Sequence, residues 1–180
     1  MGFEQKIQAM RIVRLDDEYH FKHFDCGDND LNEFLLKDAK DYQRRLLAVT
    51  YLIENEDDIV AYFSLANDKI SLNESTKSVW RKIKRNFPRS KHRRDYPAVK
   101  IGRLAVNKSY QGLQIGTIVM NYLKNLFNSR SRTGCAYLTV DALSKAVGFY
   151  EKNGFDYLCD KVSGQDYPTR LMYFDINRLK

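Results

Sequence analysis

The chain has 180 residues, of which 43% are hydrophobic and 29% are charged, and its formal net charge is +7. This length and apolar share suit one folded domain over residues 1–180 and exclude a disordered chain. There is no apolar run near the roughly 18 residues of a membrane span, and residues 1–14 lack the apolar core of a secretory signal. Three cysteines without CxxC spacing and three isolated histidines argue against disulfides and a metal site. We therefore expect a cytoplasmic protein.

The first third of the chain predicts a strand, a helix and a hairpin. A short strand is expected around Ile12–Leu15, and an aspartate of the following FDCGD turn can cap a helix. Apolar residues at helical spacing then predict an amphipathic helix over Asn29–Arg45. Two β-rich runs, Leu47–Glu54 and Ile59–Leu65, are separated by the polar turn NEDD, which predicts a β-hairpin.

The positive charge is concentrated in one segment, residues 77–94. It contains no acid and nine cations: Lys77, Arg81, Lys82, Lys84, Arg85, Arg89, Lys91, Arg93 and Arg94. Outside it, 21 basic residues face 23 acidic ones, so the whole excess belongs to this segment. Cations interleaved with Trp80, Phe87 and Tyr96 suit a nucleic-acid backbone and its bases. The simpler interpretation is a solvated, inserted basic loop that keeps the protein soluble.

The second half of the chain alternates strands with helices. We expect strands at Val99–Val106, Cys135–Val140, Phe155–Cys159 and Arg170–Phe174, and helices after the turn at 111–116 and over Lys145–Lys152. This order predicts an α/β (α+β) chain whose mixed, mostly antiparallel central sheet is flanked by helices.

The run from Val106 to Thr117 can bind an anion. A strand ends there, glycines let the backbone turn closely, and a helix begins with its first N–H groups unpaired. Those donors and the helix dipole attract phosphate groups. Gly112 and Gly116 stand where a side chain would block a phosphate, although glycine-containing turns before helices are common without a ligand.

A second segment, VDALSKAVGFYEKNGF over Val140–Phe155, holds a strand end, a short helix and an Asn-Gly-Phe stop. Tyr150 on that helix is a candidate proton donor, because its ordinary pKa near 10 keeps it protonated at neutral pH. The simpler interpretation makes Tyr150 a core residue of an amphipathic helix, one of the chain's 12 tyrosines.

Together these two motifs resemble the GNAT N-acetyltransferase superfamily over Val99–Phe155, with an IGRLAV strand, a Q-x-x-x-x-G loop, a helix, a strand and A-x-x-F-Y-E-K-x-G-F. The resemblance implies a sheet splayed between two strands, acetyl-CoA as co-substrate, no metal, and acyl transfer to an amine. It implies backbone contacts to the pantetheine arm from Leu104, Ala105 and Val106. The loop that wraps the coenzyme diphosphate is implied to be Gln111, Gly112, Leu113, Gln114, Ile115, Gly116 and Thr117. Tyr150 is implied to be the general acid for the departing thiolate.

Two positions depart from the family pattern. Gln114 stands where the pattern Arg/Gln-x-x-Gly-x-Gly/Ala has its first glycine. It weakens coenzyme binding if its Cβ intrudes, whereas a helical conformation there would tolerate it. Leu143 stands where an asparagine often precedes the tyrosine by seven residues, so one coenzyme hydrogen bond is missing or is supplied by Ser144.

A finer resemblance covers FDCGDNDLNEFL at Phe24–Leu35, VAYFSL at Val60–Leu65 and RLAV at Arg103–Val106. These segments are similar to the GNAT toxins of bacterial toxin–antitoxin pairs, a pattern that also occurs in uncharacterised relatives. Those toxins acetylate the α-amine of aminoacyl-tRNA and are neutralised by a ribbon-helix-helix antitoxin. The resemblance therefore implies tRNA and such an antitoxin as partners, and the superfamily implies a homodimer.

If tRNA is the acceptor, four arginines of the basic segment are expected to contact its phosphates: Arg85, Arg89, Arg93 and Arg94. Arg103, inside a strand, either contacts a phosphate or is an ordinary cation that points to solvent. A strand bulge near Leu104–Val106 is expected to offer an N–H group to the thioester carbonyl.

The sequence offers no clear general base, because Glu54 and Asp141 are equally ordinary carboxylates at a strand end and a turn. An α-amine with a pKa near 8 is partly neutral at pH 7, whereas lysine, near 10.4, is neutral at roughly one part in a thousand. The missing base favours an α-amine acceptor. The alternatives are an acetyltransferase acting on a protein amine or a small-molecule amine, and a catalytically idle module that binds nucleic acid.

Overall fold

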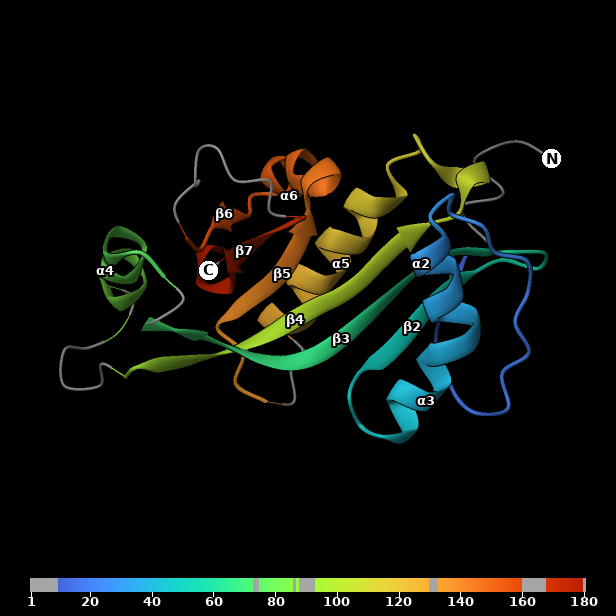
Figure 1. The fold of residues 1–180 in the computed structure, drawn as a ribbon, viewed down its shortest axis with the longest axis horizontal. Coiled ribbons are helices and arrows are strands. Elements are labelled where there is room, and N and C mark those ends of the chain that lie inside the picture. The colour runs from blue at the N-terminus through green and yellow to red at the C-terminus, as the bar shows by residue number, and fades with distance from the viewer. Residues whose placement is uncertain are drawn as a thin grey trace. The chain divides into compact units, whose positions relative to one another are not determined.

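The computed structural model describes residues 10–72, 75–85, 87, 93–129, 133–159 and 168–179. The chain forms two compact units: unit 1 comprises Met1–Ala66 and Ile101–Met120, and unit 2 comprises Asn67–Lys100 and Asn121–Lys180. Three elements run from one unit into the other, namely strands β3 (Ile59–Ser71) and β4 (Asp95–Val106) and helix α5 (Ile115–Ser129) (Figure 1). The single domain expected over residues 1–180 stays a prediction.

Unit 1 contains an antiparallel set of strands and a helical segment. Besides its shares of β3, β4 and α5, its elements are β1 (Arg11–Arg14), α2 (Asn29–Glu33), a π-helical turn (Phe34–Asp38), α3 (Ala39–Arg44), β2 (Val49–Glu54) and a 3-10 turn (Lys108–Tyr110). Strand β1 pairs antiparallel with β2, from Arg11 opposite Glu54 to Arg14 opposite Tyr51. Strand β2 also pairs antiparallel with β3, which confirms the predicted hairpin.

The helix predicted over Asn29–Arg45 is a helical segment with an internal π turn. Asp28 caps its start, because its side chain accepts a hydrogen bond from the N–H of Leu31 at 3.3 Å. Figure 1 shows α2 and α3 beside β2, and the segment's buried face packs into the apolar core of unit 1. Full burial stabilises each large apolar side chain by about 1.5–3 kcal/mol, so this packing fixes the segment that precedes it, residues 24–28.

Unit 2 contains the remaining strands and helices. Its further elements are α4 (Lys77–Arg85), β5 (Tyr137–Leu143), a 3-10 turn (Ser144–Ala146), α6 (Val147–Lys152), β6 (Asp156–Tyr157), β7 (Thr169–Asp175) and a 3-10 turn (Ile176–Leu179). Strand β4 pairs with β5 in parallel, joining Ala98–Lys100 to Tyr137–Thr139. Strands β5 and β6 each pair antiparallel with β7.

The strand order is β1-β2-β3-β4-β5-β7-β6, with one parallel pair among antiparallel ones. The predicted mixed, mostly antiparallel sheet with flanking helices is therefore confirmed. The splay between two of its strands stays a prediction.

The core of unit 2 explains two of its elements. Tyr137–Val140 of β5 are all buried, a continuous and mostly apolar run that is typical of a strand covered on both faces. Residues 77–94 were expected to form a loop, and this is wrong for their first half, because Lys77–Arg85 is the helix α4. Trp80 and Ile83 bury one face of α4 against the same core.

In the part of the chain that the structure describes, no helix is both long and apolar enough to cross a membrane. Cys26, Cys135 and Cys159 are free thiols.

Candidate functional site

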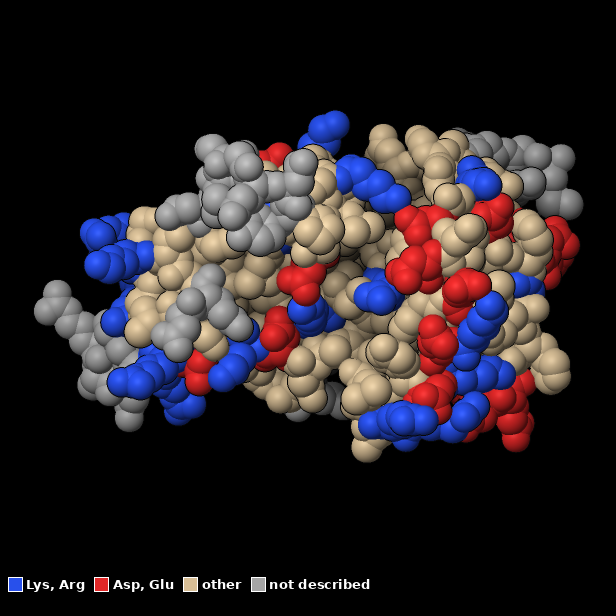
Figure 2. Space-filling model, viewed as in Figure 1, with Lys and Arg blue, Asp and Glu red and all other residues tan. Residues whose placement is uncertain are grey.

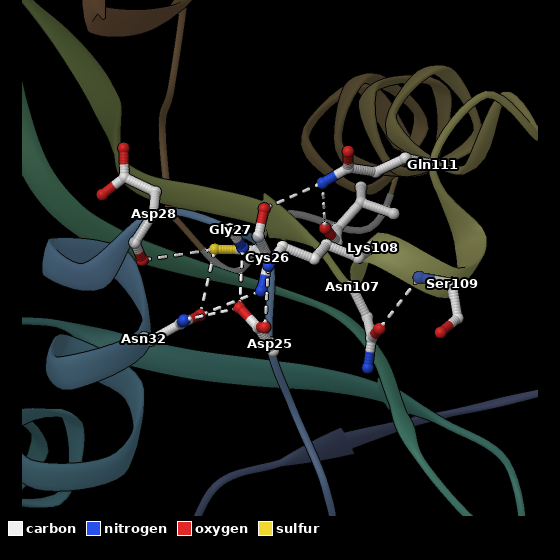
Figure 3. Close-up of polar contacts among 10 residues, drawn as sticks. Asp25, Cys26, Gly27, Asp28, Asn32, Asn107, Lys108, Ser109 and Gln111 are labelled. Atoms are coloured by element: carbon white, nitrogen blue, oxygen red, sulfur yellow. Dashed lines mark hydrogen bonds and ion pairs between the residues drawn. The ribbon is translucent and has the colours of Figure 1, made fainter.

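The loop between β4 and α5 is fixed to β3 by one buried side chain. Asn107 directly follows β4 and is 1% exposed. Its N–H donates to the carbonyl of Val60 at 2.9 Å and its Nδ2 to the carbonyl of Ile59 at 3.1 Å. Its Oδ1 accepts the N–H of Ser109 at 3.1 Å, which starts the 3-10 turn (Figure 3). The end of β4 therefore leads into the loop at a defined place and direction.

Two residues of the turn at 111–114 have left-handed backbones, Gly112 with φ +78° and Gln114 with φ +59°. Of the two alternatives for Gln114, a right-handed helical conformation does not apply, and whether its Cβ weakens coenzyme binding stays a prediction. The first bond of α5 is donated by the N–H of Ile118 to the carbonyl of Gln114 at 3.0 Å. The N–H groups of Ile115, Gly116 and Thr117 precede it and have no carbonyl partner within the helix.

This geometry fits a phosphate-binding loop. A left-handed residue followed by a helical one turns successive N–H groups toward a common concavity, and the helix dipole adds partial positive charge. A Cβ built on Gly112 would meet nothing within 4 Å, so the surface beside the turn is open. The loop geometry therefore suits a diphosphate, and the binding of one by residues 111–117 stays a prediction. The three strand residues expected beside it, Leu104, Ala105 and Val106, end β4, and Ala105 is buried.

A second segment supports this loop, and sequence reasoning missed it. Asp25 accepts the backbone N–H of Lys108 on its carbonyl at 2.8 Å and the ammonium of Lys108 on its carboxylate at 3.0 Å. Gln111 donates its side-chain amide to the carbonyls of Cys26 and Val106, both at 2.9 Å (Figure 3). The only sequence signal was that residues 24–35 carried part of the finer resemblance.

Tyr110 ties the same loop to the β2–β3 turn. Its ring is buried, its hydroxyl accepts from Nδ2 of Asn55 at 2.7 Å, and it donates to Asp58 at 3.0 Å. Burial, with the nearby carboxylate of Asp58 adding to it, raises the pKa of Tyr110. The tyrosine therefore stays neutral and acts as a structural hydrogen-bonding group.

Arg103 is held against the helical segment of unit 1. Its guanidinium lies 5.0 Å from the ring centroid of Phe34, within the range of a cation–π contact, and 4.0 Å from the carboxylate of Asp30. The Arg103 side chain is still 38% exposed, so its interpretation as an ordinary strand cation stays open. A phosphate contact from it stays a prediction.

Tyr150 lies on α6 in unit 2 and is 6% exposed. The rings of Phe149 and Phe155 pack edge-to-face against it, with centroids 5.2 and 5.4 Å away. Its backbone carbonyl accepts the N–H groups of Asn153 and Phe155, each at 3.0 Å. Burial raises the pKa of Tyr150, so the phenol is neutral at physiological pH. The core interpretation of this tyrosine and the catalytic one are therefore compatible.

The residue expected to replace the missing coenzyme hydrogen bond, Ser144, is exposed in the 3-10 turn before α6. Its N–H donates to the carbonyl of Pro168 at 3.2 Å. A coenzyme contact from Ser144 stays a prediction, and Leu143 before it is 38% exposed.

The two carboxylates considered as general bases are both engaged in ion pairs. Glu54 is fully buried, accepts from Nε of Arg11 at 2.8 Å and from the Tyr19 hydroxyl, and lies 3.6 Å from the ammonium of Lys22. Desolvation raises its pKa, but the hydrogen bonds from Tyr19 and Arg11 and the charge of Lys22 outweigh it, so the pKa is lowered. Asp141 pairs with Lys100 at 2.5 Å.

The basic segment presents its cations outward along α4. Figure 2 shows Lys and Arg side chains gathered over this helix. Lys82 pairs with Asp156 at 2.9 Å, whereas within the described residues no carboxylate pairs with Lys77, Arg81, Lys84 or Arg85. Arg93 and Arg94 are exposed before β4, and Arg89 and Lys91 lie outside the described residues.

The acetyltransferase (GNAT) family model matches residues 10–155, well over half of the chain. The chain belongs to this family. It is an acyltransferase with acetyl-CoA as co-substrate. The expectation from the strand, loop and tyrosine motifs is therefore confirmed at the level of the family.

Similar solved structures cover almost the whole chain. A tyrosine-to-phenylalanine variant of KacT is 24% identical, with a TM-score of 0.77 over 96% of this chain and 100% of that one. AtaT complexed with acetyl-methionyl-tRNAfMet is 23% identical, with a TM-score of 0.76 over 94% and 96%. A structure described as a bacterial toxin is 13% identical, with a TM-score of 0.75 over 94% and 92%. At these identities the likeness shows the fold.

Proposed function

We propose that this GNAT acetyltransferase moves an acetyl group from acetyl-CoA to the α-amine of aminoacyl-tRNA and thereby blocks translation. The observation that carries the tRNA assignment is the cationic face of α4. The likeness to AtaT, whose structure contains acetyl-methionyl-tRNAfMet, supports the same acceptor.

Helix α4 exposes a row of positively charged side chains to solvent. Trp80 and Ile83, at 4% and 1% exposure, anchor one face in the core of unit 2, so the opposite face must lie in solvent. That exposed face carries cations without a neighbouring carboxylate among the described residues, so their charge is available to phosphates. A polyanion gains most from such a surface, because each neutralised phosphate releases a condensed counterion.

Tyr150 supplies the proton donor for this chemistry. When bound, acetyl-CoA supplies an activated thioester whose leaving group is a thiolate. The buried phenol of Tyr150 is neutral, and we assign it to hydrogen-bond the sulfur as negative charge develops there. A thiol has a pKa near 8.5, below that of the buried phenol. Donating this hydrogen bond, without full loss of the proton, is therefore the favoured role of Tyr150.

The acceptor amine must be neutral to attack the thioester, and the sequence offers no clear general base to deprotonate it. The carboxylates of Glu54 and Asp141 are committed to ion pairs, so neither is available to take a proton without breaking its pair. An α-amine needs less help than a lysine, because a substantial fraction of it is already neutral near pH 7. This favours aminoacyl-tRNA over a lysine side chain as the acceptor.

The test is transfer of labelled acetyl from acetyl-CoA to bulk aminoacylated tRNA, with uncharged tRNA and Tyr150→Phe as controls. We expect label on charged tRNA only, and its loss in the variant. Acetyl-CoA binding without any transfer to tRNA would mean a protein or small-molecule amine as acceptor. A chain that acetyl-CoA does not stabilise against heat would be a catalytically idle module.

The basic helix has its own matched control. The triple variant Lys77→Gln, Arg81→Gln, Arg85→Gln should raise KM for tRNA and reduce the slope of log affinity against log salt by about two. Lys37→Gln, Arg44→Gln, Arg45→Gln removes the same charge from the π turn, the end of α3 and its C-cap, and should change neither quantity. Equal effects of the two triples would attribute the tRNA affinity to net charge alone.

A ribbon-helix-helix antitoxin is the further partner proposed with this function. An antitoxin as partner is supported by the likeness to AtaT bound to the carboxyl terminus of the antitoxin AtaR, and the ribbon-helix-helix fold is what the sequence resemblance implies. The predicted homodimer stays a prediction. Arrest of growth on induced expression, relieved by Tyr150→Phe, would tie toxicity to catalysis.

A further inference from the structure

Asp25 is at the centre of a compact polar cluster behind the diphosphate loop. One carboxylate oxygen accepts the N–H of Gly27 and Nδ2 of Asn32, both at 2.8 Å, and the other pairs with the ammonium of Lys108 at 3.0 Å (Figure 3). Its carbonyl accepts the backbone N–H of Lys108 at 2.8 Å. Asp25, Asn32 and Lys108 are called the Asp25 clasp below.

The clasp is anchored on one side and attached to the loop on the other. Asn32 belongs to α2, and its Oδ1 accepts the backbone N–H of Cys26 at 3.0 Å. The next tie is Gln111, whose side-chain amide binds the carbonyl of Cys26 at 2.9 Å. Lys108 and Gln111, which begin and follow the 3-10 turn, are thus both held by residues 25 and 26 just ahead of the turn at 111–114.

Gly27 makes the contact close. It has φ +83°, and a Cβ built on it would lie 2.7 Å from Cε of Lys108. Any other residue would therefore push the lysine stem away and strain the backbone. The absence of a Cβ at Gly27 therefore lets the stem of Lys108 lie close to this segment.

A carboxylate beside a loop that binds an anion is electrostatically unfavourable unless it is compensated. Lys108 compensates it, and the three donors to Asp25 lower its pKa to about 2. Since both partners are exposed, such an ion pair adds little to folding stability. We therefore assign the Asp25–Lys108 pair to restricting the conformation of the loop that it joins. A loop that is already ordered binds its ligand without the entropic cost of ordering.

We infer that Asp25 is a positioning residue for the coenzyme, which acts through Lys108 to hold the loop at 108–117 in its diphosphate-binding conformation. The inference rests on the proposed function only in placing the coenzyme diphosphate at this loop. It requires no particular acceptor.

The test compares the binding of coenzyme A, which has the diphosphate, with that of pantetheine, which lacks it. For Asp25→Ala we expect severalfold weaker binding of coenzyme A in calorimetric titration and unchanged binding of pantetheine by NMR titration. Asp25→Asn keeps an oxygen for Gly27 and Asn32 and should be intermediate. Asp17→Ala, which breaks the exposed Asp17–Arg44 pair in the same unit, should change neither ligand.

Three results would overturn the inference. One is an equal loss of both ligands, which would indicate general damage. Another is an unchanged affinity of Asp25→Ala for coenzyme A. A third is equally tight binding of pantetheine and coenzyme A by the wild-type chain. That result would mean that this loop does not bind the diphosphate, and it would leave the identity of the acceptor unaffected.

Lys108→Met separates positioning from direct contact. If Lys108 acts only through the clasp, its loss weakens coenzyme A binding in the wild-type background and adds nothing in the Asp25→Ala background. A further loss in the Asp25→Ala background would mean that the ammonium itself binds the diphosphate, and would contradict the assigned role of Asp25.

Discussion

The loop of unit 1 that we propose to bind the diphosphate and the helix of unit 2 that carries Tyr150 are fixed by different physical means. The loop is held by hydrogen bonds and an exposed ion pair, through Asn107, Asp25 and Gln111. Tyr150 is held by aromatic rings, with Phe149 and Phe155 packed edge-to-face on it. A loop that must present N–H groups to an anion cannot bury them, whereas a phenol that must stay protonated benefits from burial.

This difference predicts where substitutions will act. Aromatic burial contributes several kcal/mol to folding, so changes around Tyr150 should alter stability as well as rate. The polar ties of the loop contribute far less to folding, so changes there should alter coenzyme affinity with little effect on stability.

The largest effect is expected from Tyr150→Phe, which removes only the hydroxyl. We expect kcat to fall by about 10²-fold or more, because a positioned proton donor is worth that much in the transition state. KM for acetyl-CoA and the melting temperature should stay close to wild type, since the ring packing is kept. Steady-state kinetics with a labelled acyl group would check this, and an unchanged kcat would remove Tyr150 from the mechanism.

Phe155→Leu should act next most strongly and in both properties. Phe155 is 3% exposed and packs on Tyr150 and Phe174, so its loss should cost about 1–2 kcal/mol of stability. It should also lower kcat severalfold, because Tyr150 loses the ring on one side. Phe63→Leu is the matched control, since Phe63 is fully buried in unit 1 and stacks on Tyr51. We expect Phe63→Leu to lower the melting temperature by a similar amount and to leave kcat unchanged.

The comparison also shows what sequence patterns can reveal. The strands, the hairpin and both long helical segments followed from periodicity, because each has a continuous buried face. The basic helix was mistaken for a loop because its charge was weighed above the i, i+3 pair Trp80 and Ile83, which anchors it. Tyr150 was singled out as a candidate because an entire local motif surrounds it.

The polar contacts of unit 1 were beyond such reasoning. Asp25 and Lys108 are separated by 83 positions, and nothing local in either segment indicates that they pair. The sign of φ at Gln114 is likewise set by the closure of the turn and not by its own residue type. Non-local polar contacts have no periodicity, so only the fold reveals them.

Gln114→Gly should produce a smaller effect of opposite sign. A left-handed backbone costs a non-glycine residue about 1 kcal/mol, which the glycine variant avoids. Part of this gain is offset by the greater conformational freedom of glycine in the unfolded chain. We expect a net gain of about 0.5 kcal/mol, or one to two degrees in melting temperature. KM for acetyl-CoA should stay the same or fall.

Leu46→Gly is the control for that substitution. Leu46 has the same φ of +59° at the end of α3 and is 92% exposed. It should stabilise the chain by a similar amount and leave KM unchanged. If both variants lowered KM equally, the effect of Gln114→Gly would be one of overall stability and not of the loop.

The smallest expected effect is a shift in one titration. The pKa of Asp25 lies near 2 because of Asn32 first, then Lys108 and the N–H of Gly27. A carboxyl group whose pKa is lowered on folding stabilises the fold above its unfolded pKa of about 3.9, and that contribution is lost as the pH falls toward 2. Asn32→Ala and Lys108→Met should therefore each raise the pKa of Asp25, as measured by NMR of the carboxyl carbon. An unchanged pKa of Asp25 in either variant would mean that the lost partner does not hold the carboxylate in solution, and the clasp would then rest on the other partner alone.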